Sequence, residues 1–276
     1  MIRCAVLLLL VVACSGRGPA AANGELRIVS LHDVTTELVV ALGAADHLVG
    51  VDAPVDVPDE VTAAVARVPR VGDLESILAV HPTLVVGLHI VEAKQPALVA
   101  RLREAGIEVY LADPTTLDHV YALIRAVGTR IAAGPAAERL VAQLTAEAAA
   151  TAAPRPGRRA RVFVYDCCDP PFTAGGKTVL ADLIARAGGD NVFADVATAW
   201  THVSWEEVVA REPELVVIDA YAYAGQGDVA DKQRALRAIS ALAGLPMVAI
   251  PLRDSLGGIH SVEGLARLRG AIRSLP

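Results

Sequence analysis

Side chains that can bind a metal ion or a metal complex follow several short apolar segments of this sequence. His32 and His89 each come directly after such a segment, and the adjacent cysteines Cys167 and Cys168 closely follow a third. Imidazole nitrogen, phenolate oxygen and thiolate sulfur are good ligands for first-row transition metals. The residue types therefore indicate the binding of a metal ion or a metal complex.

Other polar and aromatic residues occupy comparable positions after apolar segments. Ligands of open α/β sheets lie beyond the carboxyl ends of the strands, so we expect these residues to line one cleft. Asp166, Asp169, Asp219, Arg253 and Asp254 belong to the same loops. The predicted ligand-binding residues are His32, Asp33, His89, Cys167, Cys168, Trp200, Tyr221, Tyr223 and His260, with His32 and His89 as candidate metal ligands.

These residues also have purely structural alternatives. A histidine or tyrosine in a loop can pack or be solvated without touching a ligand, and a buried cysteine behaves as a small apolar residue. Three chemical states of Cys167 and Cys168 also stay open: two free thiols, a disulfide between neighbours, and a pair of thiolate ligands.

Alternating strands and helices must position these loops. Short, continuous apolar runs predict strands at 26–30, 47–52, 80–88, 107–111, 160–165, 215–218 and 247–250. Helical patterns separate them, which favours parallel sheets. A long helix over 135–153, roughly 28 Å at 1.5 Å per residue, interrupts the alternation and can join two lobes. We therefore expect an α/β fold with an N-terminal lobe (25–134), an interlobe helix (135–153) and a C-terminal lobe (154–276).

One pattern occurs twice, which indicates that the two lobes are similar. Glu75-x-Ile-Leu-Ala-x-x-Pro-x-Leu-Val-Val returns 131 positions later as Glu206-x-Val-Val-Ala-x-x-Pro-x-Leu-Val-Val. Each copy predicts a short helix, a turn and a buried strand. Pro82 and Pro213 end the helices, and the residue before each proline is expected to be extended. Such units also recur in unrelated α/β proteins, and a glutamate at a helix N-terminus can simply stabilise the helix dipole.

The N-terminal residues have the pattern of a secretory signal. Arg3 precedes nine apolar residues, too few to span a bilayer. We expect a lipoprotein signal peptide at 1–13, a lipidated Cys14 and a tether over 14–24, which places the protein outside the cytoplasm on a membrane anchor. An ordinary signal cleaved near Ala20–Ala22 is the alternative.

Composition limits the partners. The 276-residue chain is 54% hydrophobic, enough for a sizeable core, but only 4% aromatic. Its net charge of -6 and the lack of a basic stripe exclude a nucleic-acid partner.

Four segments resemble the extracytoplasmic solute-binding proteins of ABC importers for cobalamin, haem and ferric siderophores. They are Arg27-Ile-Val-Ser-Leu31 with its following helix, Leu48-Val-Gly-Val51, Val71-Gly-Asp-Leu-Glu75 through Val86, and Val203-Ser-Trp-Glu-Glu207 through Ile218. The resemblance implies two Rossmann-like lobes with parallel sheets, joined by one long rigid helix, and a ligand in the cleft between them. It also implies a monomer that binds and does not catalyse.

The same resemblance implies the partners. A dimeric ABC permease with its ATPase subunits would receive the ligand, and Glu75 and Glu206 would pair with permease arginines, with Glu207 as a neighbour of the second. No intrinsic cofactor is implied; the bound ligand is expected to be a metal chelate.

Which chelate binds stays open. An anionic ferric siderophore needs basic residues, for which Arg253 and Lys177 are the obvious cleft candidates. Haem needs an axial ligand such as His32, His89 or Tyr221, and cobalamin needs aromatic faces such as Trp200 and Phe172. A receptor for a bare transition-metal ion is an alternative, as is an extracytoplasmic metal enzyme or a redox protein using the cysteine pair. The chain has no nucleophile elbow, zincin helix or dinucleotide fingerprint, and Gly175-Gly-Lys-Thr178 lacks the first glycine of a phosphate loop.

Overall fold

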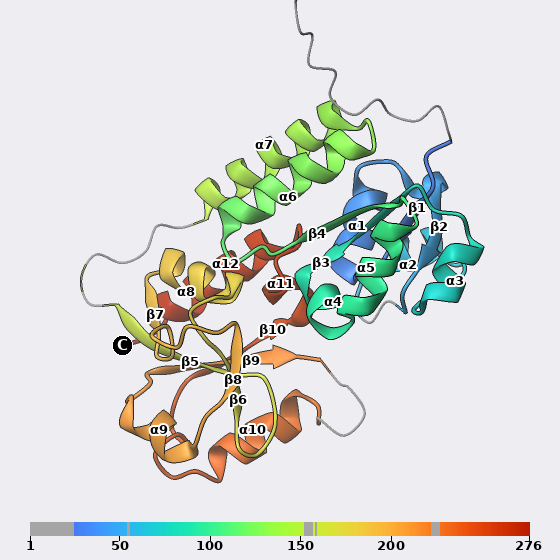
Figure 1. Cartoon of the computed structure of the whole chain (residues 1–276). Coiled ribbons are helices and arrows are strands. Elements are labelled where there is room, and N and C mark those ends of the chain that lie inside the picture. The colour runs from blue at the N-terminus through green and yellow to red at the C-terminus, as the bar shows by residue number, and fades with distance from the viewer. Residues whose placement is uncertain (1–24, 54–55, 152–156, 158, 222–226) are drawn as a thin grey trace, which may run out of the picture.

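Two parallel four-stranded sheets define two lobes (Figure 1). The structure is a computed structural model that describes residues 25–53, 56–151, 157, 159–221 and 227–276. The strand orders are β2-β1-β3-β4 in the N-lobe and β10-β9-β5-β7 in the C-lobe. The predicted α/β fold with two parallel-sheet lobes is confirmed.

The N-lobe sheet forms from apolar runs that are buried on both faces, as in parallel sheets covered by helices. All residues of β1 and β3 are buried, and Ile28 pairs with Leu84 in parallel. The sequence patterns did not predict α2 or α4. The N-lobe elements are β1 (Ile28–Ser30), α1 (Asp33–Ala41), a 3-10 turn (Ala45–His47), β2 (Leu48–Val51), α2 (Asp59–Ala64), α3 (Leu74–Ala79), β3 (Leu84–Leu88), α4 (His89–Lys94), α5 (Pro96–Glu104) and β4 (Glu108–Ala112).

The C-lobe repeats this arrangement and adds a separate two-stranded antiparallel ribbon, β6–β8; the sequence patterns predicted neither this ribbon nor β7. In the ribbon Phe172 pairs with His202 and Ala174 with Trp200. The C-lobe elements are β5 (Ala160–Tyr165), β6 (Phe172–Ala174), α8 (Val179–Ala187), β7 (Gly189–Asn191), β8 (Trp200–His202), α9 (Trp205–Ala210), β9 (Leu215–Ala220), α10 (Val229–Arg237), β10 (Met247–Pro251), α11 (Leu252–Ser255) and α12 (Ser261–Arg273).

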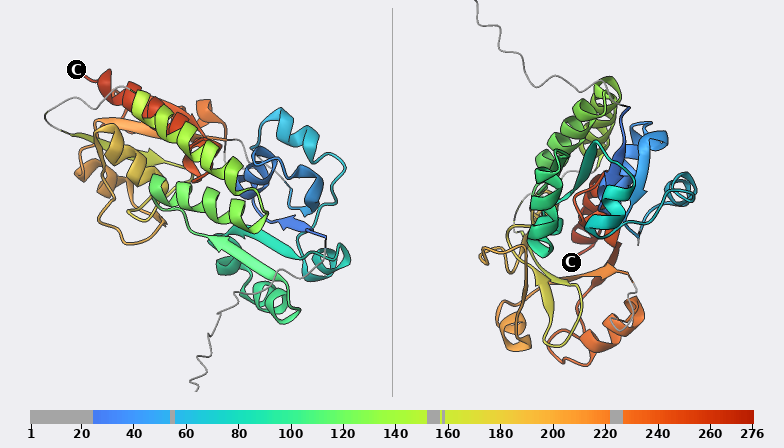
Figure 2. Two further views of the ribbon diagram at one scale, coloured as in Figure 1. Left: turned by 90° about the horizontal axis from the view of Figure 1, so that it is seen from above. Right: turned by 45° about the vertical axis from the view of Figure 1, so that its right-hand side comes forward.

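Two antiparallel helices, α6 (Leu117–Arg130) and α7 (Gly134–Ala150), lie between the two sheets in sequence and side by side in space (Figure 2). The helix expected over 135–153 corresponds to α7. Helix α6 begins against the C-lobe, where the Leu117 amide donates to Asp182 Oδ2 of α8 at 2.9 Å. Arg186 of α8 also donates to Asp118 at 2.7 Å. The helix pair therefore bridges the lobes.

One hydrophobic core runs through both lobes. It extends from Leu38 of α1 through Leu123 of α6 and Leu144 of α7 to Leu180 of α8 and Leu268 of α12, all with exposed fractions of 5% or less. Two smaller clusters lie within single lobes, one around Phe163 and one around Val85. Because the large cluster crosses the boundary, burial of apolar surface couples the lobes.

The repeated sequence pattern forms matched helices, α3 and α9. Both begin with a capping box: Asp73 and Ser76 in α3, Ser204 and Glu207 in α9. The sequence led us to expect an extended residue before each proline, and this expectation was wrong. His81 and Glu212 have φ values of 46° and 47°, so both are left-handed. Their amides bond back to the helix, to Leu78 O and Val209 O at 3.0 Å.

An arginine binds backbone carbonyls just after each of these helices. Arg27, just before β1, donates to Val80 O at 2.8 Å and to His81 O at 3.0 Å. Arg161 of β5 donates to Glu212 O at 2.5 Å. Helix ends otherwise leave unpaired carbonyls, so the arginines hold both helix ends and stabilise the left-handed residues.

Candidate functional site

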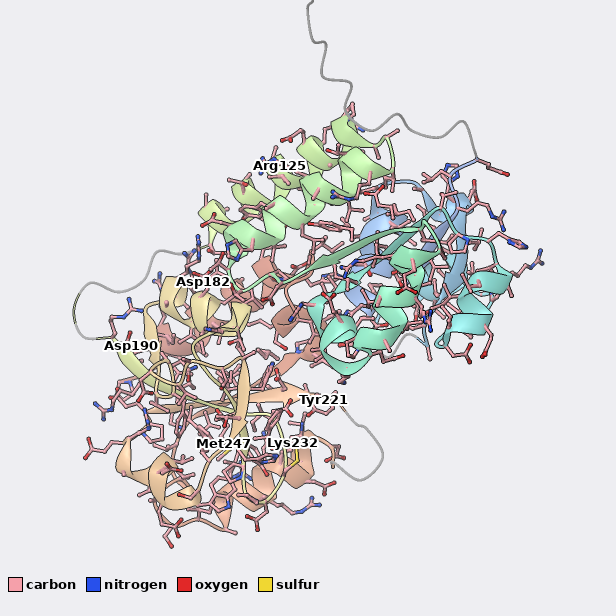
Figure 3. All side chains as sticks on the ribbon, viewed as in Figure 1. Arg125, Asp182, Asp190, Tyr221, Lys232 and Met247 are labelled. Carbon is pink, nitrogen blue, oxygen red and sulfur yellow. A yellow bond between two sulfur atoms is a disulfide. The ribbon has the colours of Figure 1, made fainter. Side chains whose placement is uncertain are left out.

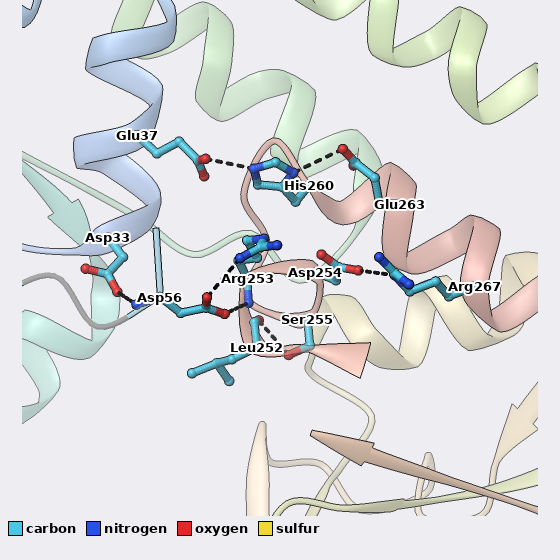
Figure 4. Close-up of polar contacts among 10 residues, drawn as sticks. All are labelled: Asp33, Glu37, Asp56, Leu252, Arg253, Asp254, Ser255, His260, Glu263 and Arg267. Atoms are coloured by element: carbon cyan, nitrogen blue, oxygen red, sulfur yellow. Dashed lines mark hydrogen bonds and ion pairs between the residues drawn. The ribbon is translucent and has the colours of Figure 1, made fainter. Parts of the chain in front are cut away.

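The carboxyl ends of the two sheets meet through a charged bridge between the lobes (Figure 4). Asp56, beyond β2, accepts hydrogen bonds from Arg253 beyond β10: Oδ1 from Nη1 at 3.1 Å and Oδ2 from the backbone amide at 2.9 Å. The Asp56 amide in turn donates to Asp33 Oδ2 at 3.0 Å. Arg253 and Asp33, both expected to face a ligand, therefore take part in joining the lobes.

A second bridge holds His260 between two glutamates. Its Nε2 lies 2.7 Å from Glu37 Oε1 of α1, and its Nδ1 lies 3.0 Å from Glu263 Oε1 of α12. Hydrogen bonds that His260 donates to the carboxylates of Glu263 and Glu37 raise its pKa to about 10. Both ring nitrogens are occupied, so in this conformation His260 links the lobes and has no nitrogen free for a ligand.

The two histidines predicted as metal ligands have different surroundings. His32 caps α1, with Nδ1 accepting from the Val34 amide at 3.2 Å, and burial lowers its pKa. His89 is the first residue of α4, with 57% of its side chain exposed, and lies 3.9 Å from Glu92. In the part of the chain that the structure describes, no group of three or more His, Cys, Asp or Glu residues is placed to hold a metal ion.

Cys167 and Cys168 form a disulfide between neighbours in the loop after β5. Disulfide sulfur is not a thiolate, so this state excludes the thiolate-pair alternative. Cys167 is buried, whereas Cys168 is exposed and left-handed at φ 77°. The Tyr165 hydroxyl donates to Cys168 O at 3.1 Å, and Trp205 Nε1 donates to Asp169 Oδ1 at 3.1 Å. The loop is therefore held in place by its disulfide and by hydrogen bonds to Tyr165 and Trp205.

The β6–β8 ribbon carries a group of packed rings next to this loop. Phe172 and Trp200 stack with ring centroids 5.8 Å apart and an interplanar angle of 21°. His202 packs on Phe172 at 4.8 Å, and its Nδ1 lies 3.1 Å from Pro170 O. A bridge between Cys167 and Phe172 joins the ribbon to the disulfide loop. Phe172 and Trp200 are partly exposed, and aromatic rings can stack on a flat ligand.

Sequence reasoning missed Lys232, which belongs to a buried charged cluster at the end of β9 (Figure 3). Only 2% of Lys232 is exposed. Its Nζ donates to Asp219 O at 2.8 Å and lies 3.7 Å from the ring centroid of Tyr221. Burial and the charge of Asp166 raise the pKa of Asp219 to about 8, and burial lowers that of Lys232. Nothing in the helical pattern of α10 distinguished this lysine from a solvated one.

Carboxylates outnumber available cations at these strand ends. At the end of β2, burial and the charge of Asp33 raise the pKa of Asp52 to about 6. The cations Arg253 and Lys232 both donate to protein oxygens. The other expected basic residue, Lys177, is exposed just ahead of α8.

Two of the predicted residues, Tyr223 and Cys14, lie outside the described residues.

A cavity of about 550 Å³ lies at the opposite, amino end of the C-lobe sheet, beside Ala160, Glu214 and Pro246. Across the described ranges no helix has the length and apolar character to cross a bilayer.

The two repeat glutamates are exposed on separate lobes. Helices α3 and α9 lie at opposite ends of the molecule (Figure 1). Within the described residues, neither Glu75 nor Glu206 forms a side-chain ion pair or hydrogen bond, whereas Glu207 accepts from the Ser204 amide at 2.8 Å. Glu207 is thus committed to capping α9, and Glu206 is the available acid.

Comparison with known proteins yields one consistent group. A family model described as "Periplasmic binding protein" matches residues 28–245. A vitamin B12-binding protein from Yersinia pestis (strain Pestoides F) is 29% identical over 200 residues, covering 71% of this chain and 70% of the relative.

Solved structures agree with this group. A periplasmic binding protein from Veillonella parvula superposes with a TM-score of 0.80 at 22% identity, covering 90% of this chain and 91% of the other. The periplasmic heme-binding protein RhuT from Roseiflexus sp. RS-1 superposes with a TM-score of 0.72 at 27% identity, covering 90% of this chain and 100% of the other.

Proposed function

The chain belongs to the periplasmic binding protein family, and from that premise we propose that it captures a metal chelate and delivers it to the permease of an ABC importer. It is a binding protein of the B12, haem and siderophore transport type, and membership places it outside the cytoplasm. The observation that supports chelate capture is the juxtaposed set of strand ends, with the aromatic β6–β8 ribbon and a disulfide loop on one lobe and His89 on the other.

The charge of the strand ends favours an uncharged or cationic chelate. Asp33 and Asp52 come from the N-lobe, and Asp166 and Asp169 from the C-lobe, whereas Arg253 is paired with Asp56 and Lys232 donates to the Asp219 carbonyl. Like charges that approach at low dielectric repel strongly. An anionic ferric catecholate is therefore disfavoured. A corrinoid, largely neutral and with a broad flat ring, fits the Phe172–Trp200 surface and is the first ligand to test.

The direct experiment measures binding of cyanocobalamin, haem, neutral ferrichrome and anionic ferric enterobactin to protein that starts at Ser15. Isothermal titration and visible spectra are expected to show stoichiometric binding of cyanocobalamin or ferrichrome and none of ferric enterobactin. Tight binding of ferric enterobactin would overturn the charge argument. No binding of any chelate would overturn chelate capture.

The proposed function also includes docking on a permease and a lipid anchor in the membrane. Glu75 and Glu206 would orient the loaded protein on a permease through two distant charges, which direct encounter more than they add affinity. Cys14 would carry the lipid. In cells, a Cys14→Ser variant should be released in soluble form, and full retention on the membrane would contradict the anchor.

A further inference from the structure

Three large apolar side chains are exposed among the described residues: Leu78 at 37%, Ile90 at 44% and Val209 at 36%. Ile90 follows His89 in α4, at the carboxyl end of β3. The other two lie on α3 and α9, the matched helices of the two lobes. Single exposed apolar residues need no explanation, but these two occupy the same place in a repeat.

Their position relative to the repeat glutamates is identical. Leu78 comes three residues after Glu75, and Val209 three residues after Glu206. Residues three apart on a helix are neighbours on one face. Each lobe therefore presents an acid–apolar pair, Glu75 with Leu78 and Glu206 with Val209.

Both pairs are carried on helices fixed at each end. A capping box holds the start of α3 and of α9, and the arginines Arg27 and Arg161 hold the carbonyls at their ends. The backbone of such fixed helices loses little conformational freedom when a partner covers it, which favours binding.

We infer that Leu78 and Val209 are docking residues that insert into apolar sockets beside basic side chains on two copies of one permease subunit. This inference rests on the proposed delivery to an ABC permease. The carboxylate beside each apolar side chain requires a basic partner group. Two matched pairs on similar lobes require a partner with two equivalent sites, which a homodimer provides.

Photo-cross-linking of the full-length chain in cells of the producing organism tests the inference. Photo-reactive p-benzoylphenylalanine is placed at position 78, 209, 75 or 206, and at the exposed Glu138 of α7 as a control. Positions 78 and 209 are expected to cross-link to the same segment of one membrane polypeptide, and position 138 to none. Cross-links to lipid alone, or to two different polypeptides, would overturn the inference.

The glutamate positions separate this inference from the proposed function. Cross-links from positions 75 and 206 without any from 78 and 209 would refute the apolar sockets and leave permease docking intact. The absence of cross-links from all four positions would refute both.

A pair of double variants then tests the chemistry of the contact. With the photo-reactive residue at position 75, Leu78→Gln with Val209→Gln should lower the cross-linking yield about tenfold or more, as for buried apolar interface residues. Leu78→Met with Val209→Ile keeps the apolar surface and should retain the parental yield. Equal yields from both double variants would contradict an apolar contact. Chelate binding by both serves as the folding control.

Discussion

At the scale of single residues, the contacts of His260 define its role. Both glutamates that hold it, Glu263 and Glu37, raise its pKa, and Glu37 belongs to the other lobe. The folded pKa of about 10 exceeds the ordinary 6.5, so the proton stabilises the folded state. This stabilisation is complete below pH 6.5 and is lost as the pH rises through 10.

A His260→Gln variant should therefore be less stable than the parent by about 2 kcal/mol at pH 6, the range for hydrogen bonds to charged groups. The difference should shrink steadily towards pH 10. Urea unfolding at pH 6, 8 and 10 measures it. His119→Gln, at an exposed position on α6, is the matched control and should show no such trend. An unchanged difference between pH 6 and pH 10 would show that the charge of His260 does not matter.

The sequence predicted which residues follow strands, but not what they contact. His260 and Glu37 are 223 positions apart, and Arg253 and Asp56 are 197 apart. Pairings at such separations depend on how the lobes pack, which no local pattern contains. The sequence also left the state of Cys167 and Cys168 open, because adjacent cysteines have the same pattern whether free or bonded.

At the scale of elements, continuous apolar runs predicted every strand of the two sheets except β7. The missed strands β6, β7 and β8 have three residues each and contain no continuous apolar run. The left-handed residues before Pro82 and Pro213 were missed for another reason. The local bias of a residue before proline is overcome by the bonds to Arg27 and Arg161.

The disulfide loop between β5 and β6 offers an element-scale prediction. Cys167→Ala with Cys168→Ala should weaken chelate binding several-fold, because the disulfide loop lies beside the β6–β8 ribbon. It should change the melting temperature little, because a bridge between neighbours closes almost no chain and so constrains the unfolded state only slightly. Titration calorimetry and thermal unfolding measure the two effects.

The single variant Cys167→Ala, which leaves one thiol, should bind as weakly as the double variant if the bonded loop is what the ligand contacts. Parental affinity in both variants would mean that the loop does not contact the ligand.

At the scale of the whole molecule, the shared core predicts cooperative unfolding. Leu123 of α6 is 2% exposed and belongs to the cluster that extends into both lobes. Leu123→Ala should cost about 2–5 kcal/mol, as for buried leucines, and accelerate hydrogen exchange equally at the most protected amides of β3 and β9. Leu123→Met, which nearly conserves volume, is the control. Two separate transitions, with only one lobe affected, would contradict a common core.

The contacts between the lobes also affect the distance between the two helices proposed to dock. Helices α3 and α9 belong to lobes that share one core, two charged bridges and the α6–α7 pair, so we expect the span between Glu75 and Glu206 to change little when a ligand binds. The protein would then engage both sites only on a permease whose two receiving sites are spaced to match. A transporter whose two receiving sites are spaced differently would engage one helix at a time, and foreign importers in the same membrane would be rejected by their dimensions rather than by their chemistry.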